Sequence, residues 1–183
     1  HRTTVHDNSY RVAFSISRSR NVTVDGCVFD NCYDGTVEID VDPQGTAPDN
    51  VSVGTVLSNC TFLNSALADI RIGTQPASAG IVYDVLVSNC VSVRATGNAV
   101  SSIVVEGGAR VKITDNLINA LNADSTVRTL ALNATDGASY TDNVEIVRNT
   151  IYTAGYGVQI ASALQTGTTS VRIPVSYTHL TLP

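Results

Sequence analysis

A repeated eight-residue segment is the feature of this sequence that most restricts its fold. Five copies share alternating aliphatic residues, a turn and one fixed anchor position, and successive anchors lie 26 to 33 residues apart. The anchors are Cys27, Cys60, Cys90, Asn116 and Asn149. Units of this length cannot bury a core alone and are typical of solenoids, in which neighbouring coils cover one another. Because Thr4 stands where an earlier anchor is expected, we predict about six coils, the first incomplete.

A short strand rich in β-branched residues follows each anchor after a turn. Segment 37–41 illustrates the pattern, since Val37, Ile39 and Val41 alternate with Glu38 and Asp40. Alternation with a period of two buries one face of a strand, so the aliphatic residues should point into the coil and the acids out of it. No 3.6-residue periodicity competes with this pattern, and Val, Thr, Asn, Ser and Gly are middling to poor helix formers. The sequence therefore predicts an all-β solenoid.

The composition excludes several classes of protein. Apolar residues make up 43% of the chain, which is too many for a disordered protein. No stretch approaches the ~18 consecutive apolar residues of a transmembrane helix. The net charge is −5, with 11 basic residues among 183, so we expect neither nucleic-acid binding nor membrane insertion. Stacked coils would hold the Cβ atoms of Cys27, Cys60 and Cys90 ~4.8 Å apart, more than the ~3.8 Å of a disulfide, so we expect reduced core residues, with Cys32 outside their column. The absence of a C-x-x-C pair gives no sign of a metal site.

The last nine residues, 175–183, differ from the rest of the chain. They fit no upstream pattern and resemble one reading frame of a transposase-end sequencing adapter. We therefore expect residues 1–174 to be a parallel β-helix fragment, cut from a longer protein at both ends. Residues 175–183 are expected to be a non-native tail.

The repeats resemble those of the right-handed parallel β-helix superfamily, the pectate-lyase-like proteins. That repeat reads approximately N-V-x-I-x-x-N-x-I, a turn, and then G-I-x-I; segments 115–118, 143–146 and 157–160 match it closely. The resemblance covers residues 4–160 and implies a single-stranded, right-handed parallel β-helix. It also implies a secreted or surface location and a polysaccharide as the partner.

The resemblance implies a substrate groove over the sheet formed by the strands that follow the anchors. Stacking should bring the densest group of charges together there, from positions 38–42 and 69–71 of neighbouring coils. We expect catalysis from Asp40, Asp69 and Arg71. We expect substrate binding from Glu38, Asp42, Glu106 and Arg128. Carboxylates are ligands of the kind that Ca²⁺ takes, so the cofactor expected is calcium, held by Glu38, Asp40 and Asp42.

Two mechanisms and one inert arrangement fit this cluster. In a lyase, calcium and Arg71 would acidify the C5 proton of a uronate, and a base would remove it in a β-elimination. In a hydrolase, two carboxylates would act as acid and base on the glycosidic bond. In the inert arrangement, the polar residues only solvate an exposed face, and Asp69 or Asp40 pairs with Arg71 at little net energy.

Three functions stay open at this point. The first is a lyase or glycoside hydrolase acting on acidic polysaccharide. The second is a non-catalytic β-helix that binds glycan through its loops, such as a homotrimeric phage-tail or cell-surface module. The third is a structural spacer. The N-T-D, G-H-G and R-I-K motifs of polygalacturonases and the W-x-D-H motif of pectate lyases do not occur, and fold alone does not decide between these functions.

Overall fold

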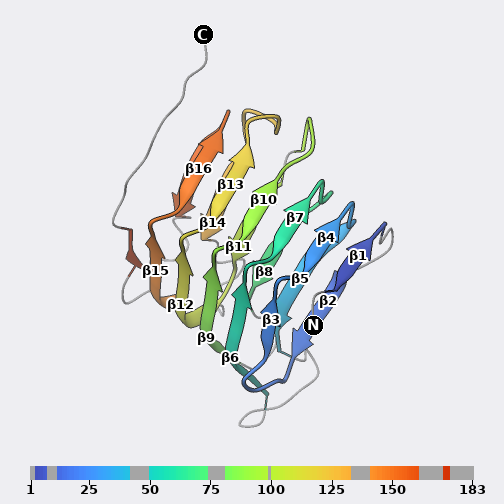
Figure 1. Cartoon of the computed structure of the whole chain (residues 1–183). Coiled ribbons are helices and arrows are strands. Elements are labelled where there is room, and N and C mark those ends of the chain that lie inside the picture. Colours follow the sequence, from blue (N-terminus) through green and yellow to red (C-terminus); the bar gives the residue numbers. More distant parts are fainter. Residues whose placement is uncertain are drawn as a thin grey trace.

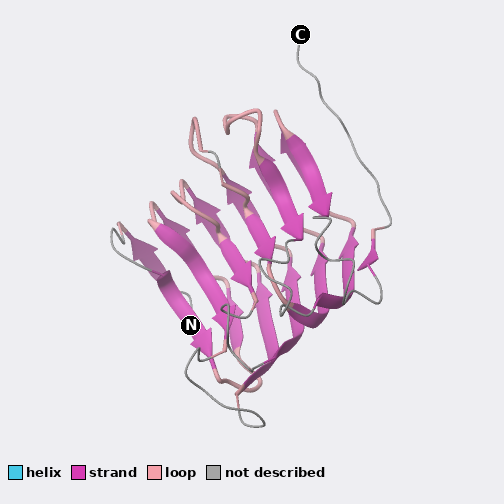
Figure 2. Cartoon of the chain, turned by 180° about the vertical axis from the view of Figure 1, so that it is seen from behind, coloured by secondary structure: helices cyan, strands magenta, loops and turns pink. Residues whose placement is uncertain are grey.

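The computed structural model describes residues 3–7, 12–41, 50–73, 81–98, 100–132, 141–160 and 171–173. Every regular element in these ranges is a β-strand, and none of them contains a helix (Figure 2). The same ranges accordingly hold no helix of the length and apolarity needed to cross a membrane. The predicted tail at 175–183 lies outside the described residues, as does Asp42.

The strands form three parallel sheets of six strands each, and the chain visits the three sheets in turn (Figure 1). Sheet A contains β1 (Thr4–His6), β4 (Val28–Asp30), β7 (Thr61–Leu63), β10 (Val91–Val93), β13 (Leu117–Ala120) and β16 (Thr150–Thr153). Sheet B contains β2 (Val12–Ser17), β5 (Asp34–Asp40), β8 (Ile70–Ile72), β11 (Ile103–Val105), β14 (Arg128–Leu132) and β17 (Tyr156–Ile160). Sheet C contains β3 (Thr23–Asp25), β6 (Val51–Ser58), β9 (Ile81–Ser88), β12 (Gly108–Thr114), β15 (Thr141–Val147) and β18 (Val171–Arg172).

This topology confirms the predicted parallel β-helix and its approximate number of coils. Within each sheet, every inner strand pairs in parallel with the strand one coil earlier and the strand one coil later, and each edge strand pairs in parallel with its one neighbour. The strands of one sheet are joined through the two other sheets, and such crossovers between parallel strands are right-handed in almost all known cases. Each repeat runs from a strand of sheet C through the anchor to a strand of sheet A and then one of sheet B. Within the described residues, the first coil therefore contributes β1 and β2, and β3 opens the second coil.

The inward faces of the strands make one continuous core. In sheet B, Val37 and Ile39 stack on Ile70 and Ile72, and these four side chains are buried. In sheet A, the rings of Phe29 and Phe62 are stacked with centroids 5.2 Å apart. Each buried aliphatic side chain of this kind stabilises the fold by roughly 1.5–3 kcal/mol.

The five anchors lie in a single column at the corner between sheets C and A, as the repeat predicts. Adjacent anchor carbonyls accept backbone hydrogen bonds from the next coil, for example from Thr61 N–H to the Cys27 oxygen at 2.9 Å and from Val91 N–H to the Cys60 oxygen at 2.9 Å. The residue before each anchor has a left-handed backbone with φ between 54° and 63°; these residues are Gly26, Asn59, Asn89, Asp115 and Arg148. Glycine, Asn and Asp adopt this conformation at the least cost.

The position of the first anchor differs from the prediction by one residue. Thr4 pairs with Val28, so Thr3 and not Thr4 is the counterpart of Cys27. The left-handed residue four positions later is Asp7, which corresponds to Asn31. The repeat is incomplete in the first coil, so the side-chain pattern alone does not fix the register there.

Candidate functional site

Three charged side chains lie together on the outer face of sheet B and are named here the Arg71 cluster: Glu38, Arg71 and Glu106. Arg71 is paired in register with Glu38 on β5, and Glu106 follows β11. Arg71 binds Glu106 through two hydrogen bonds, Nε to Oε2 at 2.7 Å and Nη2 to Oε1 at 3.2 Å. Arg71 Nη1 lies 3.9 Å from Glu38 Oε1. The structure therefore brings three of the predicted site residues together.

The Arg71 cluster is reachable from solvent. The Arg71 side chain is 41% exposed, and the two glutamates are 14% and 15% exposed. A bidentate guanidinium–carboxylate pair is geometrically specific and fixes the orientation of both groups. The cluster thus presents fixed hydrogen-bond donors and acceptors on the outer face of sheet B, with one more negative charge than positive.

Asp40 lies beside this cluster but is buried rather than exposed. Its Oδ1 accepts a hydrogen bond from the backbone N–H of Val41 at 2.7 Å. Its main-chain carbonyl accepts a hydrogen bond from the hydroxyl of Ser52. Asp40 therefore closes the corner at the end of β5 and shows little of its side chain to solvent.

Asp69 is not on the outer face at all, which corrects its predicted orientation. Its side chain is 1% exposed and forms an ion pair with the fully buried Arg94, with Oδ1 3.0 Å from Nη1. Ser92 donates a hydrogen bond to Asp69 Oδ2 at 2.6 Å, and Arg94 also donates to the carbonyl of Val100 at 3.2 Å. Asp69 and Arg71 are therefore on opposite sides of the sheet.

A bend in the backbone accounts for the inward direction of Asp69. The N–H groups of Asp69 and Ile70 both donate to the carbonyl of Ser102, at 2.9 Å and 3.1 Å. Two successive N–H groups cannot face one acceptor in a regular strand, where side chains and N–H groups alternate. As a result, Asp69 and Ile70 both face inward, and strict alternation begins only at Ile70.

The remaining predicted residues do not join the Arg71 cluster. Arg128 is exposed on β14, two coils away, where it pairs in register with Tyr156. Asp42 lies outside the described residues, so the predicted calcium ligands within them are Glu38 and Asp40. Over the described part of the chain, no three His, Cys, Asp or Glu side chains converge to hold a metal ion.

Arg94 and Ser92 are the site-related residues that sequence reasoning missed. Both belong to the stretch that follows the Cys90 anchor, where alternation suggests only a short strand. The available signal was an arginine directly after a short strand with two valines, one coil after an aspartate. An arginine buried at such a position requires an anion, and Asp69 supplies it.

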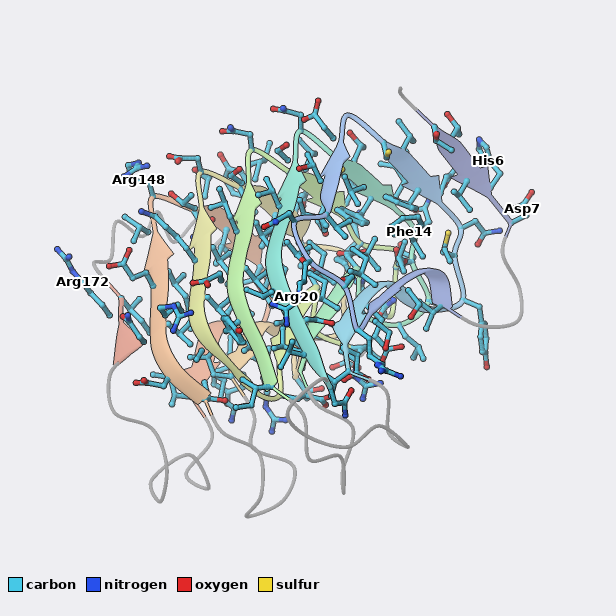
Figure 3. The ribbon with its side chains drawn as sticks, turned by 90° about the horizontal axis from the view of Figure 1, so that it is seen from below. His6, Asp7, Phe14, Arg20, Arg148 and Arg172 are labelled. Carbon is cyan, nitrogen blue, oxygen red and sulfur yellow. The ribbon has the colours of Figure 1, made fainter. Side chains whose placement is uncertain are left out.

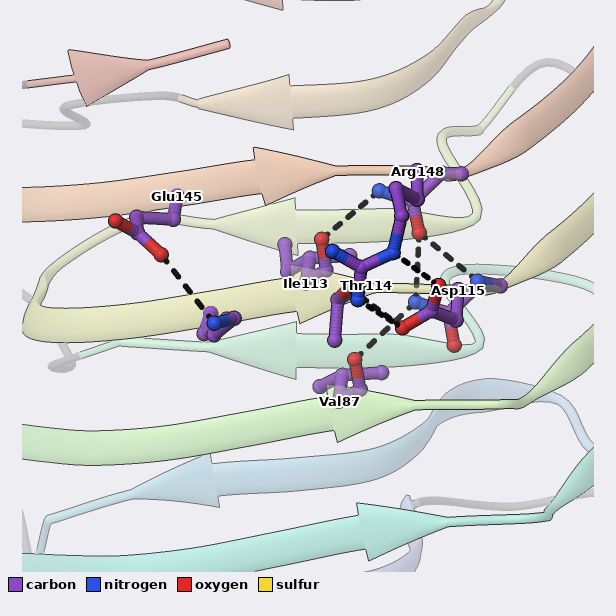
Figure 4. Close-up of polar contacts among 9 residues, drawn as sticks. Val87, Ile113, Thr114, Asp115, Glu145 and Arg148 are labelled. Atoms are coloured by element: carbon purple, nitrogen blue, oxygen red, sulfur yellow. Dashed lines mark hydrogen bonds and ion pairs between the residues drawn. The ribbon is translucent and has the colours of Figure 1, made fainter. Parts of the chain in front are cut away.

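Other charges on the outer surface form ladders between neighbouring coils. Arg110 makes a bidentate pair with Asp84 at 2.6 Å and 2.8 Å and lies over the ring of Tyr83. Arg148 pairs in the same way with Asp115, at 2.7 Å for both bonds (Figure 4). Each guanidinium lowers the pKa of its partner carboxyl below the ordinary value of 3.8.

The two ends of the solenoid carry different exposed groups. Figure 3 places His6 and Asp7 at one end and Arg148 and Arg172 at the other. His6 Nδ1 lies 3.3 Å from Asp30 Oδ2 on an exposed surface. His6 lies on β1 in sheet A, two coils before Arg71 on β8 in sheet B, and takes no part in the Arg71 cluster.

The four cysteines are free, as expected. Cys32, Cys60 and Cys90 are buried and Cys27 is half-buried. A hydrogen bond between the Cys60 and Cys90 thiols lowers the pKa of Cys60 to about 7 and raises the pKa of Cys90. Below them, Asn116 Nδ2 donates to Asn149 Oδ1 at 2.9 Å, and Asn116 Oδ1 accepts from the backbone N–H of Cys90 at 2.9 Å.

Comparison of the chain with protein-family models, curated proteins and solved structures found no match. The evidence for the fold is therefore the three stacked parallel sheets. The evidence that bears on function is the Arg71 cluster and its surroundings.

Proposed function

We propose that this chain is a non-catalytic β-helix module that binds polysaccharide along the outer face of sheet B, in a secreted or surface protein. The observation that supports it is the bidentate pair of Arg71 and Glu106, flanked by Glu38, on an accessible part of that face. Sugar hydroxyl groups both donate and accept hydrogen bonds, so a fixed group of donors and acceptors suits them. Stacked coils also provide a long, rigid face for an extended polymer.

The charge balance favours a neutral glycan over an acidic one. Glu38 and Glu106 outnumber Arg71, and Asp40 adds a further carboxyl nearby. A surface with excess negative charge repels a polyuronate unless a cation intervenes. The rest of the predicted catalytic set is engaged within the protein, since Asp69 pairs with Arg94.

Affinity electrophoresis in gels that contain a neutral polysaccharide, such as xylan, tests this proposal. We expect the wild-type chain to be retarded and Arg71→Gln to lose the retardation. Arg110→Gln is the matched control, because Arg110 also makes a bidentate carboxylate pair, but on sheet C. The proposal would be contradicted if the wild type and Arg71→Gln were retarded equally, or if none of the three proteins were retarded.

A polysaccharide lyase or hydrolase is the second candidate function. It is favoured by the placement of two carboxylates, Glu38 and Glu106, around one guanidinium. On an acidic glycan this enzyme would need calcium, with Glu38 and Asp40 among its ligands, to offset the negative charge. We expect any lyase activity to require Ca²⁺ and to be lost in Asp40→Ala. Release of unsaturated uronate in the presence of chelator would contradict the calcium mechanism.

The oligomeric state separates two versions of the binding module. A phage-tail or surface module is expected to be a homotrimer, whereas a single β-helix would be a monomer. Light scattering on the full chain distinguishes them, and either result is compatible with binding at the Arg71 cluster.

A further inference from the structure

Outward-facing positions of sheet B form one row along the solenoid, named here the outer row. Its members pair in register from coil to coil, and in chain order they are Ser15, Glu38, Arg71, Val104, Ala131 and Gln159. The strand neighbours of Val104, which are Ile103 and Val105, belong to the hydrophobic core, as do those of Ala131. Val104 and Ala131 themselves do not belong to it, which agrees with their outward direction.

Exposure changes abruptly along the outer row. Ser15 is exposed, and the side chains of Glu38 and Arg71 are 14% and 41% exposed. Val104 and Ala131, one and two coils after Arg71, are only 7% and 1% exposed although they face outward. The accessible stretch that includes Ser15, Glu38 and Arg71 therefore closes directly after Arg71.

A polymer that follows the outer row cannot stay in contact with it past Arg71. The row becomes accessible again only at Gln159, which is half-buried. Three coil steps separate Gln159 from Arg71, a distance of about 14 Å at ~4.8 Å per coil. Over that length an extended glycan would have to leave the face and lose its contacts.

We propose that the Arg71 cluster binds the end of a neutral polysaccharide chain, with the terminal sugar at Arg71 and Glu106 and the rest of the chain running toward Ser15. The polar groups that would hold it are arranged in this direction, because Glu38, Arg71 and Glu106 come from three successive coils. This inference rests on the proposed function and names the part of the glycan that the site recognises.

The hydrogen bonding of Glu106 favours a terminal sugar over an internal one. Arg71 donates once to each Glu106 oxygen, from Nε to Oε2 at 2.7 Å and from Nη2 to Oε1 at 3.2 Å. A carboxylate has about four acceptor positions, so each oxygen can accept a further hydrogen bond. A terminal sugar carries a hydroxyl where an internal sugar has a glycosidic oxygen, and only the hydroxyl can donate. A site that binds a hydroxyl discriminates against a sugar that lacks it.

Calorimetric titration of the full chain with linear xylans of two lengths tests the proposal. The two glycans are xylohexaose and a xylan several times longer, each at a known concentration of chains. Because every chain has the same ends, we expect one protein to bind per glycan chain at both lengths, with the same affinity per chain. A number of bound proteins that rises with glycan length would overturn the proposal and leave the proposed function intact. Binding to neither glycan would overturn the proposed function, and this inference with it.

Borohydride reduction of the same glycans shows which end is bound. Reduction opens the ring of the sugar at the reducing end and leaves the other end unchanged. Loss of binding after reduction places the reducing end at the Arg71 cluster, and unchanged binding places the non-reducing end there.

Glu106→Gln tests the contact with the terminal hydroxyl. We expect the affinity for both glycans to fall by the same factor, at least about tenfold, because a hydrogen bond to a charged group is lost. Glu145→Gln is the matched control, since Glu145 is also a partly exposed carboxylate beside a cation, Lys112, but on sheet C. Wild-type affinity in Glu106→Gln would overturn the proposal, and the comparison of glycan lengths does not need this variant to fold.

Discussion

Two arginine–carboxylate clusters meet at β8, one through Asp69, directly before the strand, and one through Arg71, within it, but they lie on opposite sides of sheet B. Asp69 points inward and pairs with Arg94, where both side chains are fully buried. Arg71 points outward and pairs with Glu106 and Glu38, with 41% of its side chain exposed. The inner pair has two further polar partners, the Ser92 hydroxyl and the Val100 carbonyl, whereas the outer cluster is open to solvent and to ligands.

The comparison shows that burial, and not the residue types, decides what such a pair does. A buried charge that loses its partner keeps the full cost of its lost hydration. An exposed pair is screened by water and contributes little to stability. We therefore expect the Asp69–Arg94 pair to maintain the corner between sheets A and B, and the Arg71 cluster to be available for binding.

Arg94→Met should have the largest effect on stability, because it removes the cation of the buried pair. The variant leaves the Asp69 carboxylate buried without its cation, so the free energy of unfolding should fall by about 3–5 kcal/mol. Urea denaturation followed by circular dichroism measures this loss. The double variant Asp69→Leu/Arg94→Met is the control, and it should lose less than either single variant. A loss below about 1 kcal/mol in Arg94→Met would mean that the pair is exposed or broken.

Asn116→Ala tests the stability cost of removing an uncharged buried side chain that makes several hydrogen bonds. Asn116 donates to Asn149 and to the carbonyl of Val87 and accepts from Cys90. Its loss leaves buried partners unsatisfied, so we expect a decrease of about 1–3 kcal/mol in the free energy of unfolding. Asn122→Ala, at an exposed turn position, should change stability little in the same urea experiment. Equal effects of the two substitutions would contradict the buried ladder.

Arg71→Gln measures how much the exposed Arg71 cluster contributes to stability, for comparison with the buried pair. Because Arg71 is partly exposed, its removal should lower the free energy of unfolding by less than about 1 kcal/mol, far less than Arg94→Met. The same urea denaturation measures the difference. A loss as large as that of Arg94→Met would show that the Arg71 cluster is a structural element of the core.

The smallest effect is expected in acid, from the surface ladders. Arg110 and Arg148 lower the pKa of Asp84 and Asp115 in the folded chain below the ordinary 3.8. A lowered carboxyl pKa contributes stability above the unfolded value and loses it as the pH falls through the folded value. The melting temperature should therefore drop as the pH falls below about 4, and drop less in Asp84→Asn/Asp115→Asn. If the melting temperature of this double variant fell with pH as steeply as that of the wild type, the Asp84 and Asp115 pairs would be ruled out as the source of the acid sensitivity.

The repeat was enough to predict the fold, the anchor column and the outward placement of Glu38 and Arg71. These features follow from a period-two pattern that recurs in each coil. The direction of Asp69 could not be predicted, because alternation holds only within a strand and the corner at Ser102 turns two successive residues inward. The burial of Asp40 and the pairing of Arg94 depend on contacts between coils at such corners, and a linear sequence does not specify them.

Methyl NOE spectroscopy of the inward column of sheet C shows directly whether successive coils stack in register as one parallel solenoid. Its members Leu57, Val87, Ile113 and Ile146 pair one coil apart, at about 4.8 Å. We predict strong cross-peaks for Leu57–Val87, Val87–Ile113 and Ile113–Ile146, in that order and without a strong Leu57–Ile146 contact. Absence of this series of cross-peaks, or cross-peaks that pair these strands in antiparallel register, would contradict the parallel solenoid.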